Sequence, residues 1–166
     1  MTRLPELMAS YGRYHRDPRN RATHFIGVPM IVFAVLVALA QTRGPGDWPG
    51  LAIAIAAALV VYYVILDVGL GLALGLVYAL MIAAAEPIAR EGADTAWIVF
   101  GVLFVLGWAF QLLGHRIEGN RPALLDNLHQ ILVAPIFLAA EAAMAMGLCR
   151  RLKDAVDRTA ARPERA

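Results

Sequence analysis

Long apolar runs alternate with short polar stretches along this chain. Almost uninterrupted apolar sequence fills five segments, at residues 25–39, 51–66, 68–85, 96–114 and 128–148. Lipid offers the backbone no hydrogen-bond partners, so a segment that crosses it forms a helix, which satisfies its own backbone groups. The pattern therefore predicts an all-α fold, a polytopic membrane helical bundle of four to five apolar segments.

The second and third apolar runs are separated by Asp67 alone. A single helix over residues 51–85 would be about 52 Å long, whereas the hydrocarbon core of a bilayer is about 30 Å thick. The chain must therefore fold back, and we expect the bend at Asp67. Gly71 and Gly75 would give the returning helix a small face for close packing.

The polar residues divide the chain further, although it is expected to form a single membrane domain over residues 1–166. A polar N-terminal segment, 1–23, precedes the helical bundle, 24–148, and a basic tail, 149–166, follows it. The sequence Ala38-Leu39-Ala40 resembles a signal-peptidase site. The polar segment is too long for the start of a usual signal peptide, so we interpret the first apolar run as a retained span.

The distribution of arginines predicts the orientation in the membrane. The segment before the first span carries five of them, Arg3, Arg13, Arg16, Arg19 and Arg21. The positive-inside rule then places the N-terminus in the cytoplasm. Alternate crossings put a charged loop at 86–95 outside and the polar stretch 115–127 inside. All four histidines fall on the cytoplasmic side, at the inner membrane if the protein is bacterial.

The last apolar segment conflicts with this orientation. A fifth full crossing would leave the basic tail outside, against the positive-inside rule. Pro135 interrupts the segment, and the residue before a proline resists helical conformation. We therefore favour four spans followed by a segment that is broken or re-entrant at Pro135 over five full spans.

Composition agrees with a membrane protein and excludes other classes. Of the 166 residues, 60% are hydrophobic and 17% charged, and the mean hydropathy is +0.61. The net charge is only +2, and the basic residues gather at the chain ends, which argues against nucleic-acid binding. The single cysteine, Cys149, excludes an internal disulfide and a Cys-x-x-Cys metal or redox motif.

Two polar islands carry the histidines, and each leads directly into an apolar run. The first, YHRDPRNRATHFIGVP, contains His15 and His24, and the second, GHRIEGNRPALLDNLHQ, contains His115 and His129. We expect the two islands to meet and form one site.

Glu118 follows His115 by three residues and would share its helical face. Imidazole and carboxylate without thiolate suit Fe(II), Zn(II) or Mn(II). The residues alone leave two alternatives open, a metal site and a solvated polar edge.

A resemblance to a known family makes the prediction specific. Tyr14-His15, Pro18, Asn20, His24 and Pro29, followed by WAFQLLGHRIEGNRPALLDNLHQ and APIFLAAE, resemble the membrane family of iron-dependent 2-hydroxy fatty acid dioxygenases. The resemblance extends from about Tyr11 to Gly147. It implies a membrane enzyme of fatty acid α-oxidation that uses Fe(II) and O2 to convert a 2-hydroxy fatty acid to a product one carbon shorter.

The same resemblance implies roles for individual residues. The metal ligands would be His15, His24 and His115, and the catalytic residues would be Glu118, Arg121 and Glu141. Residues that bind the substrate or support the ligands would be Tyr14, Asn20, Asp126, Asn127, His129 and Gln130. His129 departs from the family pattern, in which an apolar residue is usual, so its assignment rests on its location alone. Whether Glu118 or His129 is itself a ligand stays open.

Several residues of these motifs have alternative interpretations in the sequence itself. Arg121 could pair with a substrate carboxylate or contact lipid phosphate. Glu141 lies in an apolar run, where an acid is either functional or bonded within the helix bundle. Tyr11, Tyr14 and Trp108 are more simply interpreted as interfacial anchors and packing residues.

Two other functions compete with the dioxygenase. Paired histidines could bind haem in a membrane electron carrier, which would show a Soret band. The chain could also be a non-catalytic lipid-binding protein, in which alanine could replace the histidines without loss of function.

Overall fold

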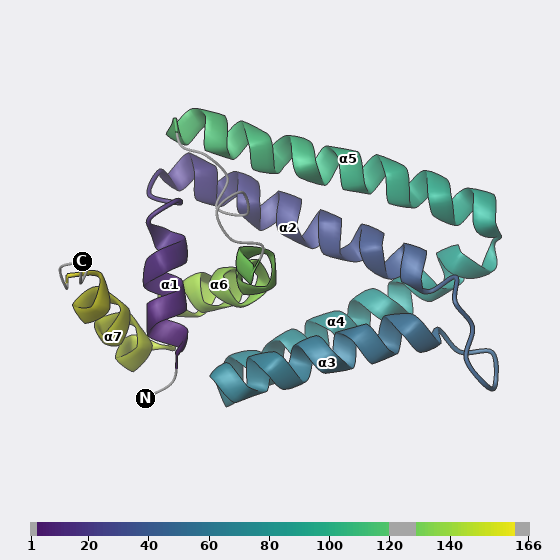
Figure 1. Ribbon diagram of the computed structural model, residues 1–166, viewed down its shortest axis with the longest axis horizontal. Coiled ribbons are helices and arrows are strands. Elements are labelled where there is room, and N and C mark those ends of the chain that lie inside the picture. Colours follow the sequence, from purple (N-terminus) through teal and green to yellow (C-terminus); the bar gives the residue numbers. More distant parts are fainter. Residues whose placement is uncertain (1–2, 120–128, 162–166) are drawn as a thin grey trace.

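The computed structural model describes residues 3–119 and 129–161, and every regular element in these ranges is a helix (Figure 1). In chain order the helices are α1 (Leu4–Gly12), α2 (Pro18–Leu39), α3 (Gly50–Leu66), α4 (Val68–Arg90), α5 (Ala93–Glu118), α6 (His129–Ala145) and α7 (Arg150–Ala160). The predicted all-α bundle is confirmed.

Helices α2 and α5 lie side by side along most of their length, with the start of α2 beside the end of α5 (Figure 1). Gly27 and Gly107 meet at this contact, where a Cβ atom on Gly27 would lie only 2.7 Å from the Gly107 carbonyl oxygen. Two backbones can approach this closely only where side chains are absent. The contact brings the polar end of α2 against the polar end of α5.

Helices α3 and α4 form a hairpin that turns at Asp67, as predicted. Asp67 is extended, with φ −158° and ψ 121°, and its side chain accepts a hydrogen bond from the Leu70 N–H at 2.9 Å. This bond caps the first turn of α4, which otherwise has unpaired N–H groups. Asp67 therefore lies at the bend between α3 and α4 and also caps α4.

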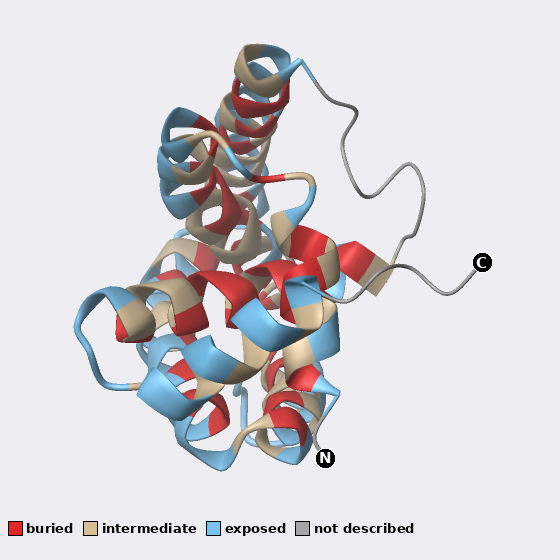
Figure 2. Cartoon of the chain, turned by 90° about the vertical axis from the view of Figure 1, so that its left-hand side faces the viewer, coloured by how far each residue is buried: buried red, intermediate tan, exposed pale blue. Residues whose placement is uncertain are grey.

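The length and composition of the helices suit a membrane. Among the described residues, α2, α4 and α5 are long and apolar enough to cross a bilayer, and a fourth span results if α6 and α7 form one bent span. Large apolar side chains are exposed on the outer faces of the helices, and they include Leu72, Leu76, Val105 and Leu113. Figure 2 colours the chain by burial and shows exposed residues along the helices. Such a surface is stable in lipid and would aggregate in water.

Two predicted boundaries were wrong. The expected loop at 86–95 is mostly helical, because α4 continues to Arg90 and α5 begins at Ala93. The charges there pair along the helix, with Arg90 Nε donating to Glu86 at 2.7 Å. The first span also begins earlier than residue 25, because Asp17 accepts a hydrogen bond from the Arg19 N–H and caps a helix that starts at Pro18.

The expected break at Pro135 was also misplaced. Helix α6 continues through Pro135 to Ala145, and the chain turns later, near Gly147, where φ is +76°. Membrane helices tolerate proline because neighbouring groups can satisfy the carbonyl that it leaves unpaired. The change of direction itself was anticipated, since α6 and α7 are bent by 115° and α7 returns to pack on α1 (Figure 1).

The α3–α4 hairpin gives a test of this packing. A Cβ atom on Gly71 would lie 2.7 Å from the Tyr63 carbonyl carbon, whereas on Gly75 it would meet only the flexible Val60 side chain at 3.2 Å. We expect Gly71→Ala to lower the free energy of unfolding by about 1–3 kcal/mol. Gly75→Ala should cost clearly less in the same denaturation experiment in detergent. Equal effects of the two substitutions would contradict the close backbone contact.

Candidate metal centre

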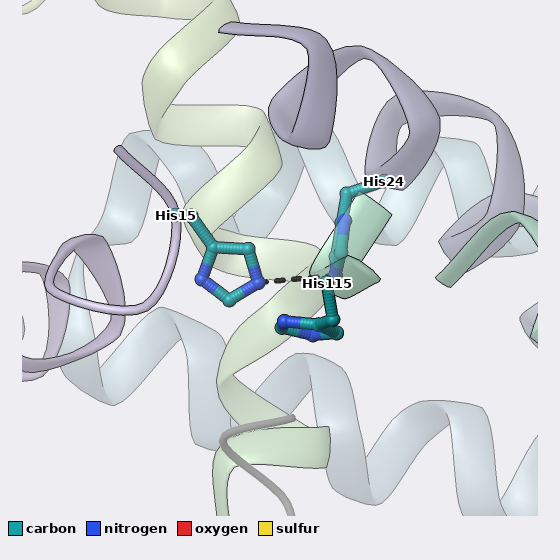
Figure 3. Close-up of side chains that lie close together, drawn as sticks. All are labelled: His15, His24 and His115. Atoms are coloured by element: carbon teal, nitrogen blue, oxygen red, sulfur yellow. Dashed lines mark hydrogen bonds between the residues drawn. The ribbon is translucent and has the colours of Figure 1, made fainter. Parts of the chain in front are cut away.

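Three of the four histidines meet in the interior of the protein (Figure 3). His15 lies between α1 and α2, His24 is on the first turns of α2, and His115 is near the end of α5. Their exposed fractions are 3%, 2% and 6%. One nitrogen from each ring lies within 4.8 Å of the other two. The two polar islands therefore meet, as the sequence predicted.

Backbone carbonyls orient two of the imidazoles. His15 Nδ1 lies 2.8 Å from the Tyr11 carbonyl oxygen, and His24 Nδ1 lies 2.9 Å from the Asn20 carbonyl oxygen. A carbonyl only accepts, so each Nδ1 must carry the proton. In a neutral imidazole the Nε2 atom then holds a lone pair.

These two lone pairs point at each other. His15 Nε2 and His24 Nε2 are 3.0 Å apart (Figure 3). Two unprotonated nitrogens at this distance repel unless a cation lies near both. His115 Nδ1 is also buried and has no partner among the described residues.

A metal ion fits this arrangement. Two nitrogen ligands at about 2.1 Å from a shared metal ion lie about 3.0 Å apart when they subtend a right angle. A set of imidazoles without thiolate suits iron, zinc or manganese. The carbonyl bonds at Nδ1 are the usual means by which a protein fixes the tautomer of a metal-binding histidine. His15, His24 and His115 could therefore hold a metal ion.

Aromatic packing fixes the position of His15. The Tyr11 ring stacks on the imidazole, with centroids 4.1 Å apart and an interplanar angle of 3°, and Phe137 packs on Tyr11 at 4.4 Å. Tyr11 is 4% exposed and packs on both rings, so of its two expected roles, interfacial anchor and packing residue, the structure supports packing. Burial lowers the pKa of His15 to about 4, which keeps the ring neutral at pH 7, as metal binding requires.

Glu118 connects the two islands. One carboxylate oxygen accepts from the Arg16 N–H at 2.6 Å and the Asp17 N–H at 3.2 Å, and the other accepts from Asn20 Nδ2 at 2.6 Å. Asn20 Nδ2 also lies 3.2 Å from the Tyr14 carbonyl oxygen. The carboxylate thus joins the end of α5 to the chain that carries His15 and His24.

The other predicted site residues are distributed more widely. Glu141 pairs with Arg21 at 2.9 Å and so links α6 to α2. His129 lies apart from the three-histidine group and contacts the Tyr62 hydroxyl at 2.9 Å. Gln130 lines a cavity beside the group. Arg121, Asp126 and Asn127 lie outside the described residues.

The cavity beside the histidines has a volume of about 90 Å³. The three imidazoles and Tyr11 line part of it. Most of the remaining wall is apolar and comes from α2, α5 and α6, including Val28, Ile31, Leu112 and Ile131. A polar head beside the histidines and an alkyl chain along the apolar wall would match this lining.

Two further residues of this wall were not among the site residues predicted from the sequence. Gln111 and Trp108 both line the cavity. Gln111 precedes His115 by four residues, which places both on one face of α5. A polar residue inside an apolar run at that spacing was the signal that could have identified it.

The fold and the site together define a polytopic helical membrane protein with a buried group of three histidines. Residues 1–146 match the family described as 2-hydroxy-palmitic acid dioxygenase Mpo1-like. The chain is 32% identical over 153 residues to 2-hydroxy-palmitic acid dioxygenase MPO1 of Saccharomyces cerevisiae. The matched region makes up 90% of this chain and 85% of the yeast protein. No solved structure matches the chain significantly. The chain belongs to the Mpo1-like family, which confirms the predicted resemblance.

The contacts of Glu118 predict an effect on metal affinity. Glu118→Ala removes the acceptor for three N–H groups and loosens the segment that carries His15 and His24. We expect the affinity for metal to fall about 10–100-fold, measured by competition with a chelator. Glu91→Ala, at an exposed residue between α4 and α5, is the matched control and should bind metal like the wild type. Unchanged affinity in Glu118→Ala would contradict the role assigned to the carboxylate.

The lowered pKa of His15 predicts a pH dependence of stability. Between its ordinary value of 6.5 and about 4, the unfolded chain binds a proton at His15 that the folded chain does not. The free energy of unfolding of the metal-free protein should therefore fall as the pH drops through this range. His15→Gln should reduce the slope in thermal unfolding measured at several pH values. An equal slope in wild type and variant would contradict the burial of a neutral ring.

Proposed function

We propose that the protein is an Fe(II)-dependent dioxygenase that shortens 2-hydroxy fatty acids by one carbon, the reaction of α-oxidation. The observation that carries the proposal is the pair of imidazole Nε2 atoms 3.0 Å apart beside a cavity with mostly apolar walls. The description of the family and the name of the yeast relative both specify 2-hydroxy-palmitic acid. An enzyme for that acid needs both a polar end and an apolar wall.

In this proposal His15, His24 and His115 hold the iron. Three protein ligands leave coordination positions open for other molecules. Bound Fe(II) supplies the redox chemistry with O2. The bonds from Nδ1 to the carbonyl oxygens of Tyr11 and Asn20 keep two of the imidazoles in the tautomer that a metal requires.

The cavity would take the head of the acid and its first carbons. The cavity volume of about 90 Å³ is well below the volume of about 300–1,000 Å³ of pockets that enclose most of a drug-sized ligand. A long acyl chain must therefore leave the cavity. Two residues of the wall, Leu112 and Ile131, are themselves 55% and 47% exposed, so the mouth of the cavity lies at the outer surface of α5 and α6. The acyl chain would extend from this mouth into membrane lipid.

The overall reaction balances without another reductant. One 2-hydroxy fatty acid and one O2 give a carboxylic acid shorter by one carbon, carbon dioxide and water. The bond between the first and second carbons breaks, and the second carbon is oxidised to the new carboxyl group. O2 accepts all the electrons that are released.

The remaining candidate residues take supporting roles in the proposal. Glu118 positions the two N-terminal histidines, and Glu141 joins α6 to α2 through Arg21. Arg121, Asp126 and Asn127 stay candidates for contacts with the substrate head. The arginine-rich N-terminal segment would place the iron site on the cytoplasmic side of the membrane.

The geometry argues against the haem alternative. A haem held by two histidines lies between them, with the iron in the porphyrin plane. The Nε2 atoms of His15 and His24 are 3.0 Å apart, which leaves no room for such a plane. The third imidazole, with its centroid 5.0 Å from that of His24, occupies the adjoining space.

Substitution of the histidines tests the proposed function. The purified, iron-loaded protein should consume O2 with 2-hydroxypalmitate and release a product shorter by one carbon, measured with an oxygen electrode and mass spectrometry. His15→Ala, His24→Ala and His115→Ala should each lose the iron and the activity, because each removes a ligand. His129→Ala, which removes the histidine outside the group, should retain the iron. An iron-loaded wild type that consumes no O2 with 2-hydroxy acids would refute the proposal.

A further inference from the structure

Buried polar atoms in the cavity wall lack partners. Gln111 Nε2, Gln130 Oε1 and His115 Nδ1 are inaccessible and make no hydrogen bond to any described residue. All three residues line the cavity. Leaving a buried donor or acceptor unpaired costs about 1–3 kcal/mol. Proteins retain such groups where a ligand pairs with them, and His115 already belongs to the three-histidine group.

The two glutamines come from different sides of the cavity. Gln111 is on α5, one turn before His115, and is 7% exposed. Its amide lies over Gly27 of α2, where an added Cβ atom would be 2.5 Å from Nε2. The glycine therefore makes the space that the amide occupies.

Gln130 is on α6 and is 8% exposed. Its Nε2 lies 3.5 Å from the hydroxyl oxygen of Ser10, a weak contact, and its Oε1 has no partner among the described residues. The cavity is thus lined by two glutamines, and each has one buried amide atom without a partner there, a donor on Gln111 and an acceptor on Gln130.

We propose that Gln111 and Gln130 together recognise the head of a 2-hydroxy acid, an inference that rests on the proposed function. An ionised carboxylate only accepts hydrogen bonds, so it pairs with the Gln111 N–H. The 2-hydroxyl group is the one donor on such an acid, and it donates to Gln130 Oε1. Both groups keep further oxygen lone pairs for the metal.

This pairing gives a physical basis for selecting hydroxylated acids. An unsubstituted fatty acid satisfies Gln111 but leaves Gln130 Oε1 buried and unpaired. A site that bonds a substrate hydroxyl binds the analogue that lacks it less tightly, because only the hydroxylated acid gives the buried acceptor a partner. The two glutamines therefore have separable roles, one for the carboxylate and one for the hydroxyl.

Binding measurements separate the two roles. The affinities of iron-loaded protein in nanodiscs for 2-hydroxypalmitate and palmitate can be measured by displacement of a fluorescent fatty acid. Gln130→Met should lower the affinity for 2-hydroxypalmitate about tenfold and leave that for palmitate unchanged. Gln111→Met should lower both affinities about tenfold. Gln41→Met is the matched control, because Gln41 donates to the Ala89 carbonyl away from the cavity, and both affinities should stay unchanged.

Iron content and thermal unfolding show whether each variant is folded. If a methionine variant loses its iron, the glutamate variant at the same position, which has nearly the same shape as glutamine, is tested in its place. Gln111→Glu should weaken the binding of both acids because it places a carboxylate against theirs, whereas Gln130→Glu keeps an acceptor and should retain the preference for the hydroxylated acid.

Two results would overturn the proposal, namely a Gln130→Met variant that keeps the wild-type preference and a Gln111→Met variant that binds both acids normally. In either case turnover by the wild type would leave the proposed function intact. A wild type that neither prefers nor converts 2-hydroxypalmitate would instead refute the proposed function itself, and the glutamine assignment with it.

Discussion

The arrangement of His15 and His24 places a strong constraint on this protein. Each ring uses its Nδ1 proton on a backbone carbonyl, so both Nε2 atoms carry a lone pair although they lie only 3.0 Å apart. Protonation of a ring would relieve the repulsion, but burial opposes the charge and lowers the pKa of His15 to about 4. A metal ion relieves it without that cost, and the third imidazole, from His115, is in place to join it.

The rest of the fold holds this arrangement together. The histidines are far apart in sequence, and the close contact of α2 with α5 at Gly27 and Gly107 brings their helices together. Glu118 then joins the end of α5 to the segment between His15 and His24 through three hydrogen bonds. Helix α6 closes the side of the cavity, so the same few helices build both the polar end and the apolar wall.

Much of this could be predicted from the sequence, because membrane helices leave a strong pattern. The apolar runs predicted the helices, and the lone Asp67 predicted the bend, although not the cap that its side chain forms on α4. Counting the apolar runs placed the two histidine-containing polar islands on the same side of the membrane, and this predicted that they meet. The predicted break at Pro135 was wrong because a proline breaks helices in water more readily than in a packed membrane bundle. The predicted loop at 86–95 was wrong because the charged side chains there pair along a helix face, and composition alone does not reveal that pairing.

The details of the cavity were beyond the sequence for a different reason. The stacking of Tyr11 on His15 and the unpaired amide of Gln111 depend on which side chains face each other across helices, and no single run encodes that. X-ray absorption of the iron-loaded protein tests the central claim most directly. It should show about three imidazole nitrogens at about 2.1 Å from the iron. Replacement of His15, His24 or His115 should remove that signal, and iron bound without imidazole scattering would contradict the account.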